Sequence, residues 1–102
     1  MYCPQVIKCT GPRACDVKDW TIFRDFKVGE NEFRGSMIRL STGHVSCDYS
    51  LKGATRDVGG GIYKAPLKLD AIDLQYWTPG EAPGYYNCRD GKNANLCPIK
   101  LK

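Results

Sequence analysis

The sequence predicts an all-β fold, a small disulfide-stabilised antiparallel sandwich or barrel of about seven short strands. Short segments with period-two alternation recur along the 102 residues, turn residues separate them, and no segment carries a convincing long helical pattern. Six cysteines in so short a chain indicate that covalent links supplement a small core. The length and the 42% hydrophobic content fit one domain, residues 1–102.

The first third of the chain alternates strand candidates with turns. Residues 3–9 contain an apolar pair between two cysteines and are followed by turn residues at 10–12, which predicts a short strand. Residues 16–28 place apolar side chains mostly at even positions, with Arg24 as the exception, and this pattern predicts a second strand. We expect a turn at residues 29–32.

The clearest strand of the sequence lies at residues 44–51, where the alternation is almost perfect. Residues 33–40 precede it and predict a strand that is bent or bulged at Gly35. Residues 41–43 then form a hairpin connection between the two strands. The side chains expected on one face of the clearest strand are Val45, Cys47, Tyr49 and Leu51.

The second half of the chain is harder to assign. Residues 52–61 hold four glycines and no periodicity, which predicts a mobile surface loop that is cut by proteases near Arg56. Residues 62–77 favour two short strands or a bulge, with a helix as the alternative. The expected remainder is a loop at 78–84, a strand at 85–88, turns at 89–95 and an edge strand at 96–102 that tolerates Pro98.

The cysteines predict three disulfides and no metal site. No two of them stand at the short spacing of a structural zinc site, and no C-x-x-C redox motif is present. The best-supported pair is Cys88–Cys97, because the eight intervening residues are polar and able to turn. The other four cysteines share two bonds, for which we expect Cys3–Cys15 and Cys9–Cys47.

Disulfides place the folded chain in an oxidising space, so we expect a secreted or periplasmic protein. The longest apolar stretches run two or three residues, far below the roughly 18 needed to cross a bilayer. No N-terminal apolar block resembles a signal peptide, and Met1 directly before Tyr2 is expected to be a start added where such a peptide was removed.

The net charge of +4 is uneven along the chain. Residues 89–102 contribute four basic residues against Asp90, and this tail could touch an anionic polymer. The remaining charges are well mixed, as on an ordinary soluble surface, so we expect no specific nucleic-acid partner. The basic residues of the tail are Arg89, Lys92, Lys100 and Lys102.

Catalytic and cofactor motifs are weak. His44 is the single histidine, with Ser41 and Asp48 nearby, but local spacing cannot establish a triad and no nucleophile elbow is present. The glycines at 59–61 lack the Lys-Ser/Thr of a phosphate-binding loop. We therefore expect no cofactor and no metal. The carboxylate pairs that a glycosidase could use are Asp70 with Asp73 and Glu30 with Glu32.

Four aromatic residues flank the Pro/Gly loop at 78–84. Exposed aromatic faces on a rigid β framework bind sugars or protein partners, so this cluster is the candidate binding surface. The alternative is that the rings fill the small core. The residues are Tyr76, Trp77, Tyr85 and Tyr86.

A resemblance covers nearly the whole chain. It is carried by Cys-Pro-x-x-x-Ile-x-Cys at residues 3–9, Cys15 with Trp20, the Val-x-Cys-x-Tyr strand at 45–49, a late Trp77, and Cys88 before Cys97-Pro98. This spacing resembles a family of small secreted bacterial proteins of unknown function, of legionella type. The resemblance implies a Sec-exported, disulfide-bonded domain that leaves the cell by type II secretion, and it brings no known catalytic residues.

Together these observations favour a monomeric, secreted, non-enzymatic binding or effector-like module that recognises a host or cell-surface protein or glycan. An enzyme of this size is expected to carry a stronger local nucleophile, metal or acid/base signature. The alternatives are a carbohydrate-binding module and a small secreted hydrolase.

Overall fold

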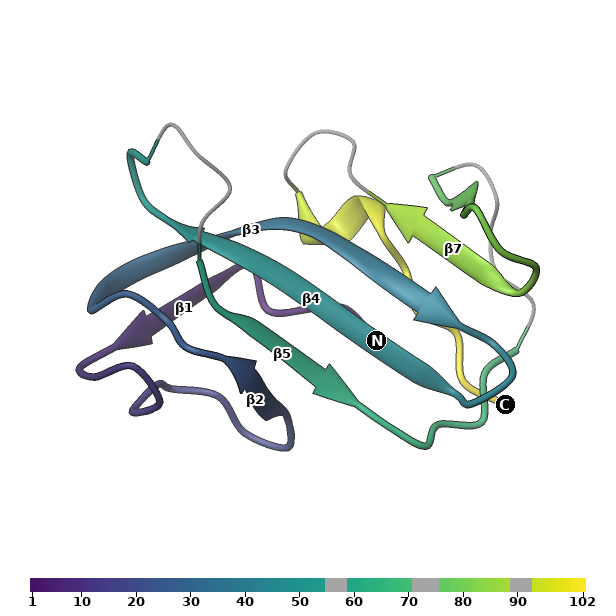
Figure 1. The fold of residues 1–102 in the computed structure, drawn as a ribbon, viewed down its shortest axis with the longest axis horizontal. Helices are drawn as coiled ribbons and strands as arrows, with labels where there is room; N and C mark the ends of the chain where they lie inside the picture. Colours follow the sequence, from purple (N-terminus) through teal and green to yellow (C-terminus); the bar gives the residue numbers. More distant parts are fainter. Residues whose placement is uncertain (55–58, 71–75, 89–92) are drawn as a thin grey trace.

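The computed structural model describes residues 1–54, 59–70, 76–88 and 93–102, and its regular elements are β-strands and one short 3-10 helix (Figure 1). This confirms the predicted all-β class. The strands are β1 (Val6–Cys9), β2 (Thr21–Arg24), β3 (Gly29–Arg39), β4 (His44–Leu51), β5 (Gly61–Lys64), β6 (Thr78–Pro79) and β7 (Tyr85–Cys88), and the 3-10 helix is η1 (Ala94–Leu96).

The seven strands belong to one antiparallel sheet with the order β2-β5-β4-β3-β7-β6 (Figure 1). The central strand is β3. One edge of β3 pairs with β4, whereas its other edge is shared by β1, close to Gly29, and β7, close to Arg39. The end strands β2 and β6 do not pair with each other in the described part of the chain. The expected sandwich or barrel is therefore a single open sheet.

The strand β3 is longer than predicted and bent in the middle. Its register with β4 shifts between Phe33 and Gly35, which confirms the bulge expected at this glycine. The turn predicted at residues 29–32 is wrong, because these residues begin β3 and pair with β1. Their composition is typical of a turn, but the backbone partner that β1 provides makes them a strand.

Three other segments differ from their predictions. Only Thr21–Arg24 of the predicted strand 16–28 is paired, with β5. Residues 96–102 are not an edge strand, since η1 ends at Leu96 and, among the described residues, this segment forms one isolated bridge, from Leu101 to Leu69. The predicted loop at 78–84 begins with β6. In the uncertain segment 62–77, β5 is a strand, and residues 71–75 lie outside the described residues.

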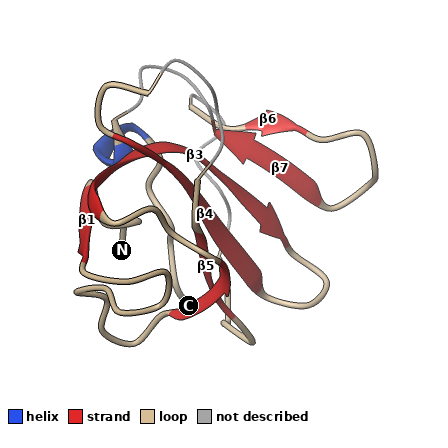
Figure 2. Ribbon diagram, turned by 60° about the vertical axis from the view of Figure 1, so that its left-hand side comes forward, coloured by secondary structure: helices blue, strands red, loops and turns tan. Residues whose placement is uncertain are grey.

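One face of the sheet is covered by the N-terminal and C-terminal segments of the chain. The Met1 ammonium group and the Ile99 amide each donate a hydrogen bond to the other residue's carbonyl oxygen, at 2.7 and 2.8 Å. Figure 2 shows both chain ends on the same side of the sheet. The buried side chains beneath them include Val45, Cys47 and Tyr49 of β4. The core therefore forms between one sheet face and two irregular segments.

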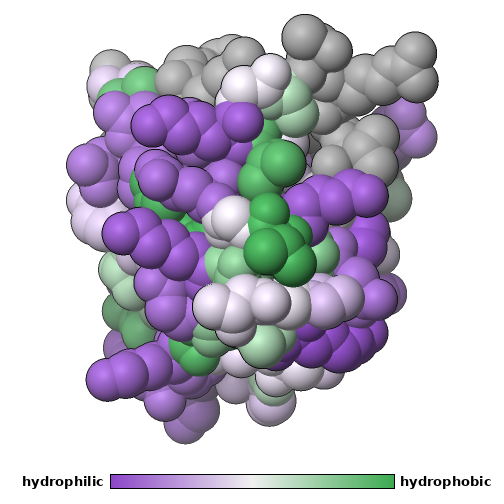
Figure 3. Space-filling model, turned by 90° about the vertical axis from the view of Figure 1, so that its left-hand side faces the viewer, coloured by the Kyte–Doolittle hydropathy of each residue, from purple (hydrophilic) through white to green (hydrophobic). Residues whose placement is uncertain are grey.

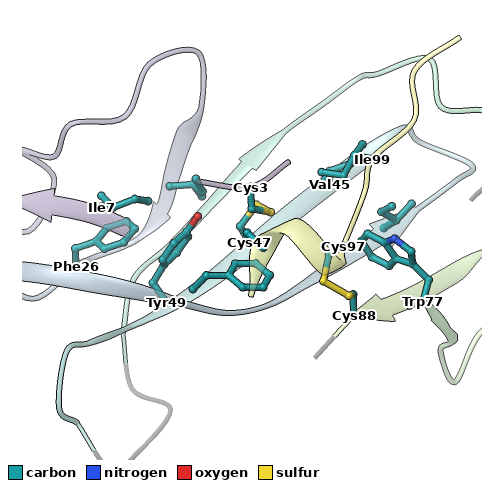
Figure 4. Close-up of a cluster of buried hydrophobic side chains, with 14 of the residues drawn as sticks. Cys3, Ile7, Phe26, Val45, Cys47, Tyr49, Trp77, Cys88, Cys97 and Ile99 are labelled. Carbon is teal, nitrogen blue, oxygen red and sulfur yellow. A yellow bond between two sulfur atoms is a disulfide. The ribbon is translucent and has the colours of Figure 1, made fainter. Parts of the chain in front are cut away.

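Tyr49 holds the N-terminal segment to this core. Its ring packs against the ring of Phe26, with a centroid distance of 5.7 Å (Figure 4), and against the ring of Phe33, at 6.1 Å. Its hydroxyl donates a hydrogen bond of 2.6 Å to the carbonyl oxygen of Pro4. Burial raises the pKa of Tyr49 far above its ordinary value, and the nearby Asp48 carboxylate raises it further. The phenol is therefore neutral in the folded protein.

The disulfides confirm one predicted pair and correct the other two. Cys88–Cys97 is present as expected, and it lies beside Trp77 in the core (Figure 4). The remaining bonds are Cys3–Cys47 and Cys9–Cys15, not Cys3–Cys15 and Cys9–Cys47. The N-terminal segment crosses the covered face of β4, which brings Cys3 over Cys47. The turn after β1 returns Cys15 to a bridge with Cys9.

The glycines at 59–61 are close-packing positions rather than parts of a mobile loop. All three are buried. A β-carbon at Gly59 would overlap the carbonyl oxygen of Tyr49, and one at Gly60 would overlap the Phe26 ring. Only glycine fits where two chain segments approach this closely. Residues 55–58, which contain the proposed cleavage point at Arg56, lie outside the described residues.

The end of the molecule that carries β1 and β2 is largely hydrophilic. Figure 3 shows a narrow apolar stripe between hydrophilic side chains on this end. Val6 of β1 and Val28, just before β3, are exposed hydrophobic residues, and Val28 is 61% exposed. Within the described ranges, no helix has the length and apolar character needed to cross a membrane.

Candidate functional site

The second face of the sheet carries a row of aromatic and cationic side chains that crosses five strands. The members come from β2, β5, β4, β3 and β7 in that spatial order, and they are Phe23, Tyr63, His44, Arg39 and Tyr85. We call them the aromatic row and the surface that carries them the open face. Phe23 is 43% exposed, Arg39 is exposed, and the other three are half-buried.

The strand register brings the row together. Arg39 lies opposite His44 on β4 and opposite Tyr85 on β7. Tyr63 lies opposite Ser46, which is two residues after His44 on the same face of β4. Because side chains alternate along a strand, the neighbours of these residues point to the covered face. Those buried neighbours are Ile38, Val45 and Ile62.

Ring contacts order one half of the aromatic row. The His44 and Tyr63 rings are stacked, with centroids 5.1 Å apart and planes inclined by 14°. The Phe23 ring meets Tyr63 edge-on at 6.0 Å. Phe23 also lies against the backbone of Gly61, where a β-carbon would displace its ring. These contacts hold the three rings in fixed positions before any ligand binds.

Two arginines differ in how they are held on this face. The guanidinium of Arg24 lies 5.4 Å from the Phe23 ring centroid and forms an ion pair of 2.8 Å with Asp48. The guanidinium of Arg39 lies 5.2 Å from the centroid of Tyr85. Within the described residues, the Arg39 side chain makes no hydrogen bond or ion pair. Its N–H donors are therefore directed to solvent or to a ligand.

A shallow pocket adjoins the Tyr85 end of the row. It has a volume of about 560 Å³, within the range of small-molecule sites. Strands β3 and β7 contribute Met37, Tyr85 and Asn87, and the loop after β6 contributes Gly80, Glu81 and Ala82. The loop is tied to Tyr85, because the Gly80 amide donates to the Tyr85 carbonyl at 2.6 Å and the Tyr85 amide donates to Ala82 at 3.2 Å.

The four aromatic residues singled out in the sequence do not form one surface. Trp77 is 1% exposed, and its indole N–H donates a 2.9 Å hydrogen bond to the Pro98 carbonyl oxygen, so its ring belongs to the core. Tyr76 and Tyr86 are half-buried and pack against the same core. Tyr85 alone lines the open face and its pocket. The alternation of β7 separates Tyr85 from Tyr86 by placing them on opposite faces.

The other candidates are placed as follows. The His44 ring stacks on Tyr63, and Glu30 lies 3.9 Å from the Lys52 amine. Asp73 and the basic residues at 89 and 92 lie outside the described residues. No group of three or more His, Cys, Asp or Glu in the described ranges could hold a metal ion.

The sequence interpretation missed Phe23, Tyr63 and Arg39. Phe23 interrupts the even-position pattern of residues 16–28, and such an apolar residue out of phase is the one local signal that a second face is used. Tyr63 and Arg39 carry no such signal. Their proximity depends on the pairing of β3, β4 and β5, whose register decides which side chains become neighbours.

No protein-family model, curated protein or solved structure matches this chain. The functional argument therefore depends on the geometry of the open face.

Proposed function

We propose that this protein is a secreted, non-enzymatic binding module that recognises a host or cell-surface partner through the open face. The observation that carries the proposal is the aromatic row, which places aromatic rings and an arginine side by side on one sheet surface; among the described residues, the guanidinium of this arginine has no polar partner. Five adjacent strands at about 4.8 Å spacing give a row about 19 Å long. A row of this length fits within the surface of about 800 Å² that each partner contributes to a standard recognition interface.

The residue types in the row are those that dominate binding energies. Tyrosine and arginine are enriched among the few residues that carry most of an interface's affinity. On a sheet their side chains are already ordered by neighbours, as the stacked His44 and Tyr63 rings are. Less conformational entropy is then lost when a partner binds.

The proposal also includes export of the protein from the cytoplasm to an oxidising compartment. Three disulfides fit an oxidising compartment, such as the periplasm or the cell exterior. Secretion from a bacterium by the type II route, and action as an effector, are supported by the resemblance in cysteine and aromatic spacing. A surface built from exposed and half-buried rings is consistent with a partner met outside the cell.

Binding of the labelled, disulfide-intact protein to intact eukaryotic cells and to bacterial envelopes tests the proposal. We expect saturable binding that weakens roughly tenfold in Tyr63→Ala and in Arg39→Ala. The matched control is Val28→Ser, which changes an exposed side chain outside the open face and should stay within about twofold of wild type. Unchanged binding in folded Tyr63→Ala and Arg39→Ala proteins would show that another surface is used.

The hydrolase alternative has its own assay. The wild-type protein and His44→Ala are incubated with ester, peptide and glycoside substrates under the same conditions. We expect no turnover by either protein. A hydrolytic activity that disappears in His44→Ala would overturn the non-enzymatic assignment.

A further inference from the structure

We infer that the pocket beside Tyr85 is a saccharide subsite that takes an uncharged pyranose ring. The inference rests on the proposed function, since it names the ligand class for one end of the open face. The pocket is formed by the β6–β7 hairpin on one side and by β3 on the other.

One wall of the pocket is the loop between β6 and β7, and backbone contacts hold this loop close to Tyr85. Gly80 lies so close to Tyr85 that a β-carbon there would approach the Tyr85 β-carbon to 2.8 Å. Two backbone hydrogen bonds join this loop to Tyr85, and Gly84 takes a φ of 82° at the return. The loop that carries Glu81 and Ala82 is therefore held against the backbone and β-carbon of Tyr85, so the site needs little rearrangement to bind a ligand.

The apolar residues that line the pocket suit one face of a pyranose. Sugars present a face of C–H groups, which packs on aromatic rings by burying flat apolar area. Tyr85, Met37 and Ala82 provide such a surface. The Arg39 guanidinium lies over the Tyr85 ring and helps to fix its orientation, while Arg39 itself does not line the pocket.

The polar residues that line the pocket suit hydroxyl groups, which both donate and accept hydrogen bonds. Asn87 offers an amide that does both, and the Glu81 carboxylate accepts. Within the described residues, neither side chain makes a hydrogen bond or ion pair, so both are available to a ligand. Glu81 also disfavours a second negative charge in the pocket. This carboxylate is the reason for assigning an uncharged sugar rather than a uronate.

Amide chemical-shift mapping of the full chain tests the inference with neutral disaccharides, namely cellobiose, lactose and maltose. We expect at least one of them to shift the amides of residues 80–87. Tyr85→Ala and Asn87→Ala should weaken that binding roughly tenfold or more, whereas Tyr85→Phe keeps the stacking ring and should stay close to wild type. No shift with any of the three sugars, or equal binding by Tyr85→Ala, would overturn the assignment.

A disaccharide of glucuronic acid tests the charge argument. It should bind more weakly than the neutral sugars, and Glu81→Gln should reduce the difference. Tighter binding of the uronate that is lost in Arg39→Ala would overturn the uncharged assignment.

The control Tyr63→Ala separates the two proposals. It changes the open face at the far half of the aromatic row, so sugar binding should persist while cell-surface binding weakens. Cell-surface binding that depends on Tyr63, without any sugar response, overturns the saccharide subsite and leaves the proposed function intact. Sugar binding without any cell-surface binding overturns the proposed function and leaves the saccharide subsite intact.

Discussion

The imidazole of His44 lies parallel to the phenol ring of Tyr63, with centroids 5.1 Å apart, across the paired strands β4 and β5. This contact gives the single histidine of the chain a structural place beside an aromatic ring. Because Tyr63 in turn contacts Phe23, a continuous set of ring contacts joins three members of the aromatic row.

Loss of the His44 ring should affect stability modestly and recognition more strongly. We expect His44→Ala to lower the free energy of unfolding by about 0.5–1.5 kcal/mol, the size of an aromatic pair on a sheet. His44→Phe keeps a stacked ring and is the matched control. Urea unfolding measures the stability, and cell-surface binding measures recognition. Equal stability of the two variants would show that the stack contributes nothing.

The glycine at residue 60 should tolerate no side chain. A methyl group there would overlap the Phe26 ring, so Gly60→Ala should destabilise the fold by about 1–3 kcal/mol. Gly11→Ala is the control, because its added methyl makes an ordinary contact with Ala14 and should change stability by less than about 0.5 kcal/mol. Thermal unfolding of the two variants makes the comparison, and a stable Gly60→Ala protein contradicts the packing described.

The three disulfides should contribute unequally to stability. Cys3–Cys47 closes a separation of 44 residues and Cys9–Cys15 a separation of only six. By chain entropy, replacing the first pair with alanines should cost about 4 kcal/mol and replacing the second about 2 kcal/mol. Denaturant unfolding of both double variants tests the order. Peptide mapping of the unreduced protein checks the pairing itself, and a Cys3–Cys15 peptide would contradict it.

Tyr49 should make stability depend on pH in the alkaline range. Its pKa is raised in the folded state, so its contribution is fully present below the unfolded pKa of about 10 and is lost as pH rises beyond it. Tyr49→Phe should lose about 1–3 kcal/mol at pH 7, because the Pro4 carbonyl oxygen loses its donor. Its stability should then fall less steeply above pH 10 than that of wild type. Parallel alkaline slopes in urea unfolding would refute this account.

Trp77 should behave as a core residue. Trp77→Phe removes the donor to the Pro98 carbonyl oxygen and some buried volume, so we expect a loss of about 1–3 kcal/mol. Cell-surface binding of the folded variant should match wild type, since the indole is buried. Weaker binding at unchanged stability would show that Trp77 contributes to partner recognition and not only to the core.

The local order of the sequence determined several elements by itself. The alternation of residues 44–51 predicted β4 with its bounds, and Gly35 marked the bulge of β3. Cys88 and Cys97 were paired correctly on the basis of the short sequence between them, since their separation in the chain is only nine residues. In each case the deciding residues lie within one strand, one hairpin or one short stretch of the sequence.

The tertiary structure decided which faces are covered and which segments meet. Periodicity shows that Tyr85 and Tyr86 point in opposite directions, but not that terminal segments cover the Tyr86 side. The Cys3–Cys47 bond depends on the N-terminal segment crossing β4, and the stacking of His44 on Tyr63 depends on the register of β4 with β5. These contacts join residues remote in the chain, and their free energy comes from burial that local alternation does not encode.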